Sequence, residues 1–208
     1  MKELEQLGII PVDYSVLSSL FSYIRFPRNK IANLEKANKI IRLKRGIYVV
    51  SPDISKQLLS IELIANHIYG PSYVSMESAL SYYGLIPEKV YTTRSMTTNR
   101  SKKFENSIGI FEYTTVSNSY YPLGIKQQTV ENKFTFLIAT PEKALCDMIT
   151  TTPQLRIQSE KALIAYLEED LRFDVSVLED MDTDIIKECI KTGKKKTILK
   201  ILLNLIEQ

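Results

Sequence analysis

The residues from Tyr23 to Val50 constrain this chain most, because they combine a strong positive charge with a change of hydrophobic period. Eight basic residues stand there against a single acid, Glu35, so the stretch carries +7 in a protein whose net charge is +3. The other 180 residues therefore sum to −4. A charge asymmetry of this kind is typical of a surface that faces a polyanion.

The pattern inside this stretch predicts a helix followed by a hairpin. Pro27 is a favourable first helical residue, and apolar residues recur at helical spacing over 27–38. Apolar and basic residues then alternate over 41–44, Arg45-Gly46 suits a tight turn, and alternation resumes over 47–49. A basic helix that runs into a basic hairpin is typical of the end of a winged-helix DNA-binding unit.

In such a unit the helix can enter the major groove, while the hairpin lays its cations along phosphates. Base contacts are expected from polar residues such as Asn29, Lys30 or Asn38. The predicted DNA-binding residues are Arg25, Arg28, Asn29, Lys30, Lys39, Arg42, Lys44 and Arg45. Only two helices are clear before the hairpin, over 13–24 and 27–38, with room for a stub over 2–7, whereas a full winged helix has three. One alternative is an ordinary helix and hairpin that pack together with a basic surface; another is a protein-interaction module whose basic stretch meets an acidic protein partner.

Length and composition indicate a soluble globular protein of one large or two small domains. The break at Ser51-Pro52-Asp53 predicts a boundary, giving a winged-helix-like domain over 1–52 and a second domain over 53–208. No apolar run is long enough to cross a bilayer, and the charged start of the chain has no secretory pattern. Two separated cysteines indicate free thiols in a reducing cytoplasm. One histidine and these two cysteines make a metal site improbable, and no cofactor is expected.

The second domain is predicted to be mixed α+β, with a small, mostly antiparallel sheet and a helical tail over about 155–208. Its expected helices cover 55–69 and 75–83, and another starts at Thr140-Pro141; its expected strands lie at 73–74, 90–98, 109–116, 124–130 and 133–139. A loop between the second and third strands carries Arg100, Lys102 and Lys103, a possible second contact with phosphate. The twelve tyrosines are expected to serve a sheet core, with stacking on unpaired bases as the alternative.

No complete active site is recognisable, so no enzyme is predicted and no catalytic residue is named. The chain has neither a P-loop nor a G-x-G-x-x-G motif. Glu131 and Lys133 form an E-x-K pattern found in metal-dependent nucleases, but it falls at a predicted hairpin turn, without an acidic partner on a preceding strand. Lys143 and Asp147 are four residues apart on a predicted helix, and a surface ion pair is expected there.

Three landmarks occur in a fixed order along the chain. They are LKRGIYVV at 43–50, then GPSYVSMESALSYYGLIPEKVYTTRSMTTNR at 70–100 with GIFEYTTV at 109–116, and finally IATPEKALCDMI at 138–149. Together they resemble the AbiEi-type antitoxin and transcriptional regulator family of type IV toxin–antitoxin, abortive-infection systems, over about residues 12–150. Tyr83 stands before Gly84-Leu85 where the family often has histidine.

The resemblance implies a bacterial, cytoplasmic autoregulator whose N-terminal winged helix binds double-stranded operator DNA in its own promoter. It implies a larger C-terminal domain needed for antitoxin action against a nucleotidyltransferase-like toxin, without a stable complex between the two proteins. By this resemblance, the basic helix and the wing are expected to contact DNA. The family has no catalytic residues that could be carried over to this chain. The short N-terminal region departs from the family. A winged helix reduced in this way could dock through phosphates alone or through a protein partner.

Overall fold

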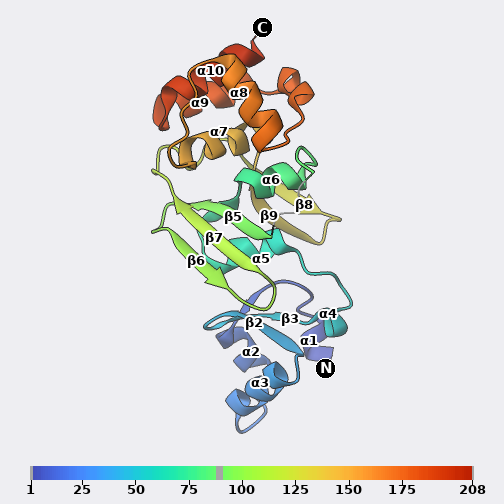
Figure 1. Cartoon of the computed structure of the whole chain (residues 1–208). Coiled ribbons are helices and arrows are strands. Elements are labelled where there is room, and N and C mark those ends of the chain that lie inside the picture. The colour runs from blue at the N-terminus through green and yellow to red at the C-terminus, as the bar shows by residue number, and fades with distance from the viewer. Residues whose placement is uncertain (1, 88–90, 208) are drawn as a thin grey trace.

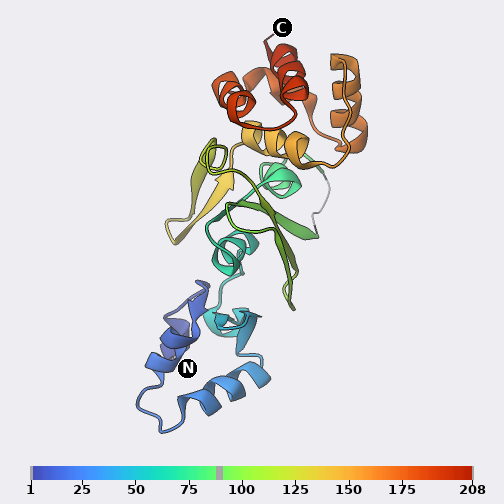
Figure 2. The same cartoon turned by 90° about the vertical axis from the view of Figure 1, so that its left-hand side faces the viewer.

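The computed structural model describes residues 2–87 and 91–207, and the α+β class expected from the sequence is confirmed. The molecule is elongated: the N-terminal elements occupy one end, a six-stranded sheet lies in the middle, and the C-terminal helices form the other end (Figures 1 and 2). Within the described residues, no helix is long and apolar enough to cross a membrane.

The N-terminal end contains short helices and a three-stranded antiparallel sheet in the order β1-β3-β2. Its elements are α1 (Lys2–Glu5), β1 (Val12–Asp13), α2 (Tyr14–Leu20), α3 (Pro27–Lys36), β2 (Ile40–Lys44) and β3 (Ile47–Val50). The predicted hairpin and the stub helix are therefore present. Helix α2 is shorter than the predicted 13–24, and β1 was not predicted because a two-residue strand leaves no periodic signal.

Both faces of this small sheet are buried, each against a different apolar cluster. Tyr48 and Val50 face the N-terminal helices, in a cluster with Leu17 and other buried residues of the first 54 positions. Leu43 and Val49 instead belong to the large core that continues through the rest of the chain. Strand residues alternate between faces, so a single hairpin supplies both cores.

The central sheet is mixed, with the order β6-β7-β5-β4-β9-β8. Its strands are β4 (Ser72–Val74), β5 (Thr92–Thr97), β6 (Lys102–Glu105), β7 (Ile110–Thr115), β8 (Ile125–Val130) and β9 (Phe134–Ala139). Three pairings are antiparallel, while β4–β9 and β5–β7 are parallel. The sheet is therefore more mixed than the predicted, mostly antiparallel one. Strand β5 runs parallel to β7 because the segment between them is itself a strand, β6, rather than the predicted loop.

Helices cover the sheet and build the C-terminal end (Figure 2). They are α4 (Pro52–Ser55), α5 (Ile61–Ile68), α6 (Met76–Tyr82), α7 (Pro141–Thr151), α8 (Glu160–Ala165), η1 (Tyr166–Asp170), η2 (Val175–Asp180), α9 (Thr183–Thr192) and α10 (Lys196–Ile206). The helix predicted over 55–69 starts later, as α5, with Ser60 as its cap, while α4 occupies part of the predicted break at 51–53 and ends where Lys56 adopts a left-handed conformation. Residue 90, predicted to open a strand, lies outside the described residues.

The ion pair between Lys143 and Asp147 is buried, so its predicted surface location is wrong. Both side chains are fully inaccessible, with Lys143 Nζ 3.0 Å from Asp147 Oδ1. Tyr73 Oη and Ser75 Oγ donate to Asp147 Oδ2 at 3.0 and 2.6 Å. Lys143 Nζ also donates to the Tyr120 carbonyl at 3.2 Å. Spacing along a helix reveals such a pair but not its burial, which here follows from α9 packing over α7.

Removing one member of this pair should destabilise the fold strongly. Replacing Lys143 by Met leaves the Asp147 carboxylate buried without its counter-charge, a change that costs about 3–5 kcal/mol. The free energy of unfolding from urea titrations measures the effect. Lys187→Met is the control, because Lys187 forms a comparable 2.9 Å pair with Glu207 at the surface and its loss should change stability little. Equal effects of the two substitutions would contradict the importance of burial.

Buried tyrosines should make the protein sensitive to alkaline pH. Burial raises the pKa of Tyr83 to about 12 and also raises the pKa of Tyr73 and Tyr120. A raised pKa in the folded state gives stability that is complete below the unfolded value of about 10 and is lost as pH rises above it. The free energy of unfolding should therefore be flat near pH 9 and fall between pH 10 and 12. Tyr83→Phe should lessen that fall; an unchanged slope would contradict the assignment.

Candidate functional site

Helix α3 holds its cations outward because its opposite face is anchored in the N-terminal core. Ile31 and Leu34 are 2% and 5% exposed and pack among the residues of α2 and the small sheet. Arg28, Asn29 and Lys30 lie one turn earlier and are exposed. The apolar positions of α3 thus fix which side chains reach solvent, as expected for an amphipathic helix.

Three arginines, one from α3 and two from the hairpin, line one cavity of about 530 Å³ between α3 and the hairpin. Arg28 comes from α3, Arg42 from β2 and Arg45 from the β2–β3 turn. Tyr14 and Tyr48 also line this cavity. Its one acidic lining residue is Glu35, so the cavity holds an excess of positive charge and suits an anion.

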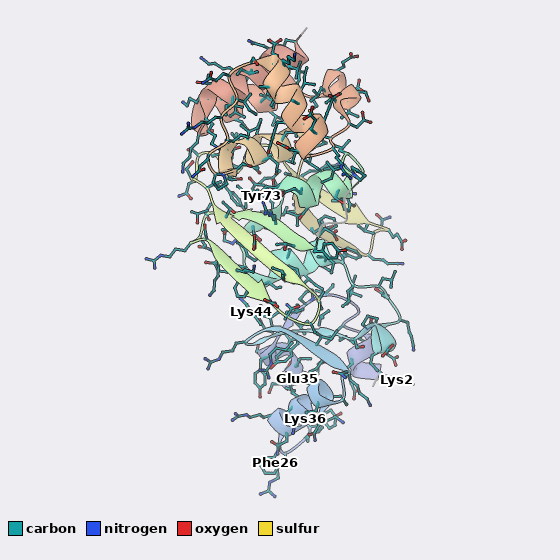
Figure 3. All side chains as sticks on the ribbon, viewed as in Figure 1. Lys2, Phe26, Glu35, Lys36, Lys44 and Tyr73 are labelled. Carbon is teal, nitrogen blue, oxygen red and sulfur yellow. The ribbon has the colours of Figure 1, made fainter. Side chains whose placement is uncertain are left out.

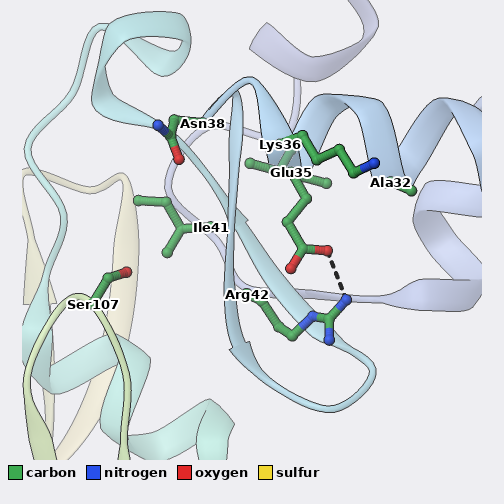
Figure 4. Close-up of a pocket in the computed structure, with 8 residues that line it drawn as sticks. Ala32, Glu35, Lys36, Asn38, Ile41, Arg42 and Ser107 are labelled. Atoms are coloured by element: carbon green, nitrogen blue, oxygen red, sulfur yellow. Dashed lines mark hydrogen bonds and ion pairs between the residues drawn. The ribbon is translucent and has the colours of Figure 1, made fainter.

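Arg42 bridges the space between the hairpin and α3 (Figure 4). Its guanidinium lies 2.7 Å from the Glu35 carboxylate and packs over the Tyr48 ring at 5.6 Å. The hydrogen bond with Glu35 raises the pKa of Arg42. The Arg42 side chain is still 52% exposed, and a register shift in β2 directly follows it. Such irregularities re-aim side chains.

A second cavity of about 550 Å³ shares Arg42 and Glu35 and extends away from the turn (Figure 4). Lys36 and Asn38 contribute to it from the end of α3 and the residues that follow. Ser107, from the β6–β7 turn, lines its far side. The two cavities therefore follow the free edge of β2 alongside α3, and the Arg42–Glu35 pair lies at their junction.

The other predicted residues do not join this cavity. Arg25 is exposed before α3 and packs over the Phe26 ring at 5.2 Å. Asn29 and Lys30 are exposed on α3. Lys39 is half-buried where the chain enters β2. Lys44 reaches the opposite way and lies 5.8 Å from the ring of Phe104 in β6.

The second predicted group lies mostly on a strand rather than in a loop. Lys102 and Lys103 belong to β6, which forms an edge of the central sheet, while Arg100 precedes it; all three are exposed. Lys102 Nζ lies 5.0 Å from the Phe104 ring, and Lys103 pairs with Glu112 at 3.0 Å. Phe104 thus has a cation from each sheet over its ring, so β6 continues the basic surface that begins at Lys44.

The aromatic lining was missed from the sequence. Tyr14 and Tyr48 read as ordinary periodic positions, and nothing local indicates that a helix start and a strand 34 residues apart flank one cavity. A detectable signal was the absence of any acid between Asp13 and Glu35, a run that contains three basic residues. That run leaves α2, its connection to α3 and the part of α3 before Glu35 without an acidic residue.

Among the described residues, no further metal-binding groups join Glu131 and Lys133, the pair that a metal-dependent nuclease would use. Glu131 and Lys133 lie in the exposed β8–β9 turn, where they pair with each other at 2.5 Å. Across residues 2–87 and 91–207, no three His, Cys, Asp or Glu side chains come together in a way that could hold a metal ion. The two cysteines are free and buried.

Comparison of the sequence with protein-family models finds no match. Comparison with curated proteins finds none either. The candidate site is accordingly defined by its geometry: a cationic cavity between a helix and a hairpin, with one acid in it.

Glu35 limits the positive potential of this cavity, and neutralising it should strengthen binding to any polyanion. Glu35→Gln removes one negative charge and frees the Arg42 guanidinium, so the variant should leave a heparin column at higher NaCl concentration than the parent protein. The corresponding gain in affinity is about threefold, the size expected for an exposed ion pair. Glu131→Gln is the matched control, because it makes the same charge change in a distant ion pair. Equal shifts for both variants would show that only net charge matters.

Proposed function

We propose that this protein is a DNA-binding transcriptional autoregulator and the antitoxin of a bacterial type IV toxin–antitoxin system of the AbiEi type. The observation that carries the proposal is the convergence of Arg28, Arg42 and Arg45 on one cavity beside an exposed basic helix. The order of elements supports a winged-helix interpretation: α1, β1, α2, α3 and then the β2–β3 hairpin, with β1 completing the sheet. The short α1 takes the place of a longer first helix.

In this proposal α3 lies in the major groove, which is about 12 Å wide and admits one helix. A phosphate of the flanking DNA backbone occupies the arginine cavity and replaces Glu35 as the partner of Arg42. Asn29 and Lys30 are placed on the exposed side of α3 to reach base edges. The cations of β6, with Lys44, provide a second set of phosphate contacts beyond the wing.

The antitoxin role is assigned to the residues after the hairpin, 53–208, and rests on the resemblance alone. The functional partner is a nucleotidyltransferase-like toxin that forms no stable complex with this protein, and the site of action is the cytoplasm. The rival is a protein-interaction module whose basic surface meets an acidic partner, the toxin itself. The alternative with the least support is a metal-dependent nuclease, since Glu131 and Lys133 lie in an exposed turn and pair with each other.

Reversing two wing charges should weaken binding to all DNA sequences alike. We expect the double substitution Arg42→Glu with Lys44→Glu to lower affinity for the promoter of the protein's own gene and for a scrambled duplex by a similar factor. The slope of log affinity against log salt should become shallower by about 0.9 for each phosphate that the variant no longer neutralises. Fluorescence anisotropy titrations over a range of NaCl concentrations measure both quantities. Lys133→Glu with Lys191→Glu, at two exposed and remote lysines, is the charge-matched control.

Promoter binding that is unchanged in the wing variant would show that the wing is wrongly assigned. Co-purification with the toxin at moderate salt, in the absence of DNA, would favour the interaction module instead. Metal-dependent cleavage of DNA that disappears when Glu131 and Lys133 are substituted would favour a nuclease.

A further inference from the structure

Phe26 occupies an unusual position for a large apolar side chain. It is the residue immediately before α3, and it is 57% exposed at the outermost tip of the N-terminal end (Figure 3). The Arg25 guanidinium lies 5.2 Å from its ring. Its neighbour in the same connection, Tyr23, is also exposed, but the Tyr23 hydroxyl donates to Glu3 at 3.1 Å and so has a partner within the chain.

The side chain of Phe26 works against the stability of the helix that it precedes. The residue at this position normally offers a Ser, Thr, Asp or Asn oxygen to the first free N–H groups, and Phe26 makes no such bond. It also leaves an aromatic ring in water. Residues that break a local rule without a structural gain are expected at functional positions. The ring, which the Arg25 guanidinium covers on one side only, is therefore accessible to a ligand.

The charges around Phe26 favour a nucleic-acid ligand. Arg25 and Arg28 flank it, both exposed, and no acid occurs between Asp13 and Glu35. A tip with two exposed arginines beside an apolar ring is complementary to a ligand that is anionic outside and has an apolar group inside. Duplex DNA fits this description, because its phosphates flank grooves where base edges are exposed.

We propose that Phe26 packs against a thymine methyl group and thereby sets sequence preference at that base. The inference rests on the proposed function. The N-terminal residues of a recognition helix contact base edges in the major groove, and the thymine methyl is the apolar group exposed there. Phe26 stands at that end of α3, so its ring meets a base edge while Arg25 and Arg28 reach phosphates on either side.

The experiment pairs the residue with the methyl group. The full-length protein is titrated with the duplex that carries its own promoter, and each thymine is replaced in turn by uracil, which lacks only the methyl. The parent protein should lose about fourfold in affinity at one or two positions, the loss expected for one apolar carbon. Phe26→Ala should bind the parent duplex more weakly and lose nothing further at those positions. Phe26→Leu should retain part of the sensitivity. Leu58→Ala, at a remote and 89% exposed apolar residue, should behave as the parent.

Phe26→Ser distinguishes recognition from a structural role. Serine supplies the missing cap and removes an exposed ring, so the melting temperature should rise by about 2 °C while affinity for the promoter falls. A lower melting temperature would show that Phe26 serves the fold, and uracil effects that persist in Phe26→Ala would show that another residue reads the methyl; either result overturns the inference. If the Arg42 and Lys44 variant loses DNA binding but Phe26→Ala does not, this inference alone fails. If the parent protein binds no DNA, the proposed function fails with it.

Discussion

The structure depends on one small sheet that is buried on both sides. The β2–β3 hairpin gives Tyr48 and Val50 to the N-terminal core, and Leu43 and Val49 to the large one. A side-chain bond adds to this, since Asn106 Nδ2 donates to the Leu43 carbonyl at 2.9 Å. The hairpin therefore cannot slide by one residue without exchanging the contents of both cores. That restriction fixes where its arginines stand.

Holding three arginines around one cavity requires the chain to offset their mutual repulsion. Glu35 supplies one opposite charge, and the Tyr48 ring supplies a face for the Arg42 guanidinium. Neither interaction buries a charge, because Arg42 keeps half of its surface in water. The other strong ion pair, Lys143–Asp147, is of the opposite kind: it has no access to solvent and ties α7 to Tyr73 and Ser75. The Arg42–Glu35 pair is open to solvent and the Lys143–Asp147 pair is closed to it.

Local sequence patterns predicted much of the fold and part of the candidate site. Pro27, the change of period near Ile40 and the Arg45-Gly46 turn define α3 and the hairpin, and the structure has both. The predictions that failed depended on contacts between distant parts of the chain. Strand β6 was taken for a polar loop because edge strands need few apolar residues, and Lys143 was placed at the surface because spacing carries no information about what packs above a helix. The convergence of Arg28 with Arg42 and Arg45 needed the tertiary structure, since their positions along the chain do not reveal it.

The doubly buried hairpin has a mechanical consequence. With its two sides in different cores, it joins the packing of the N-terminal elements to that of the central sheet, while the cationic tip and the C-terminal helices lie at opposite ends of the molecule (Figure 1). A ligand bound at the cationic tip would thus set the orientation of the whole elongated molecule. Under the proposed function, two copies bound at adjacent DNA sites would contact each other, or not, according to the helical phase between those sites.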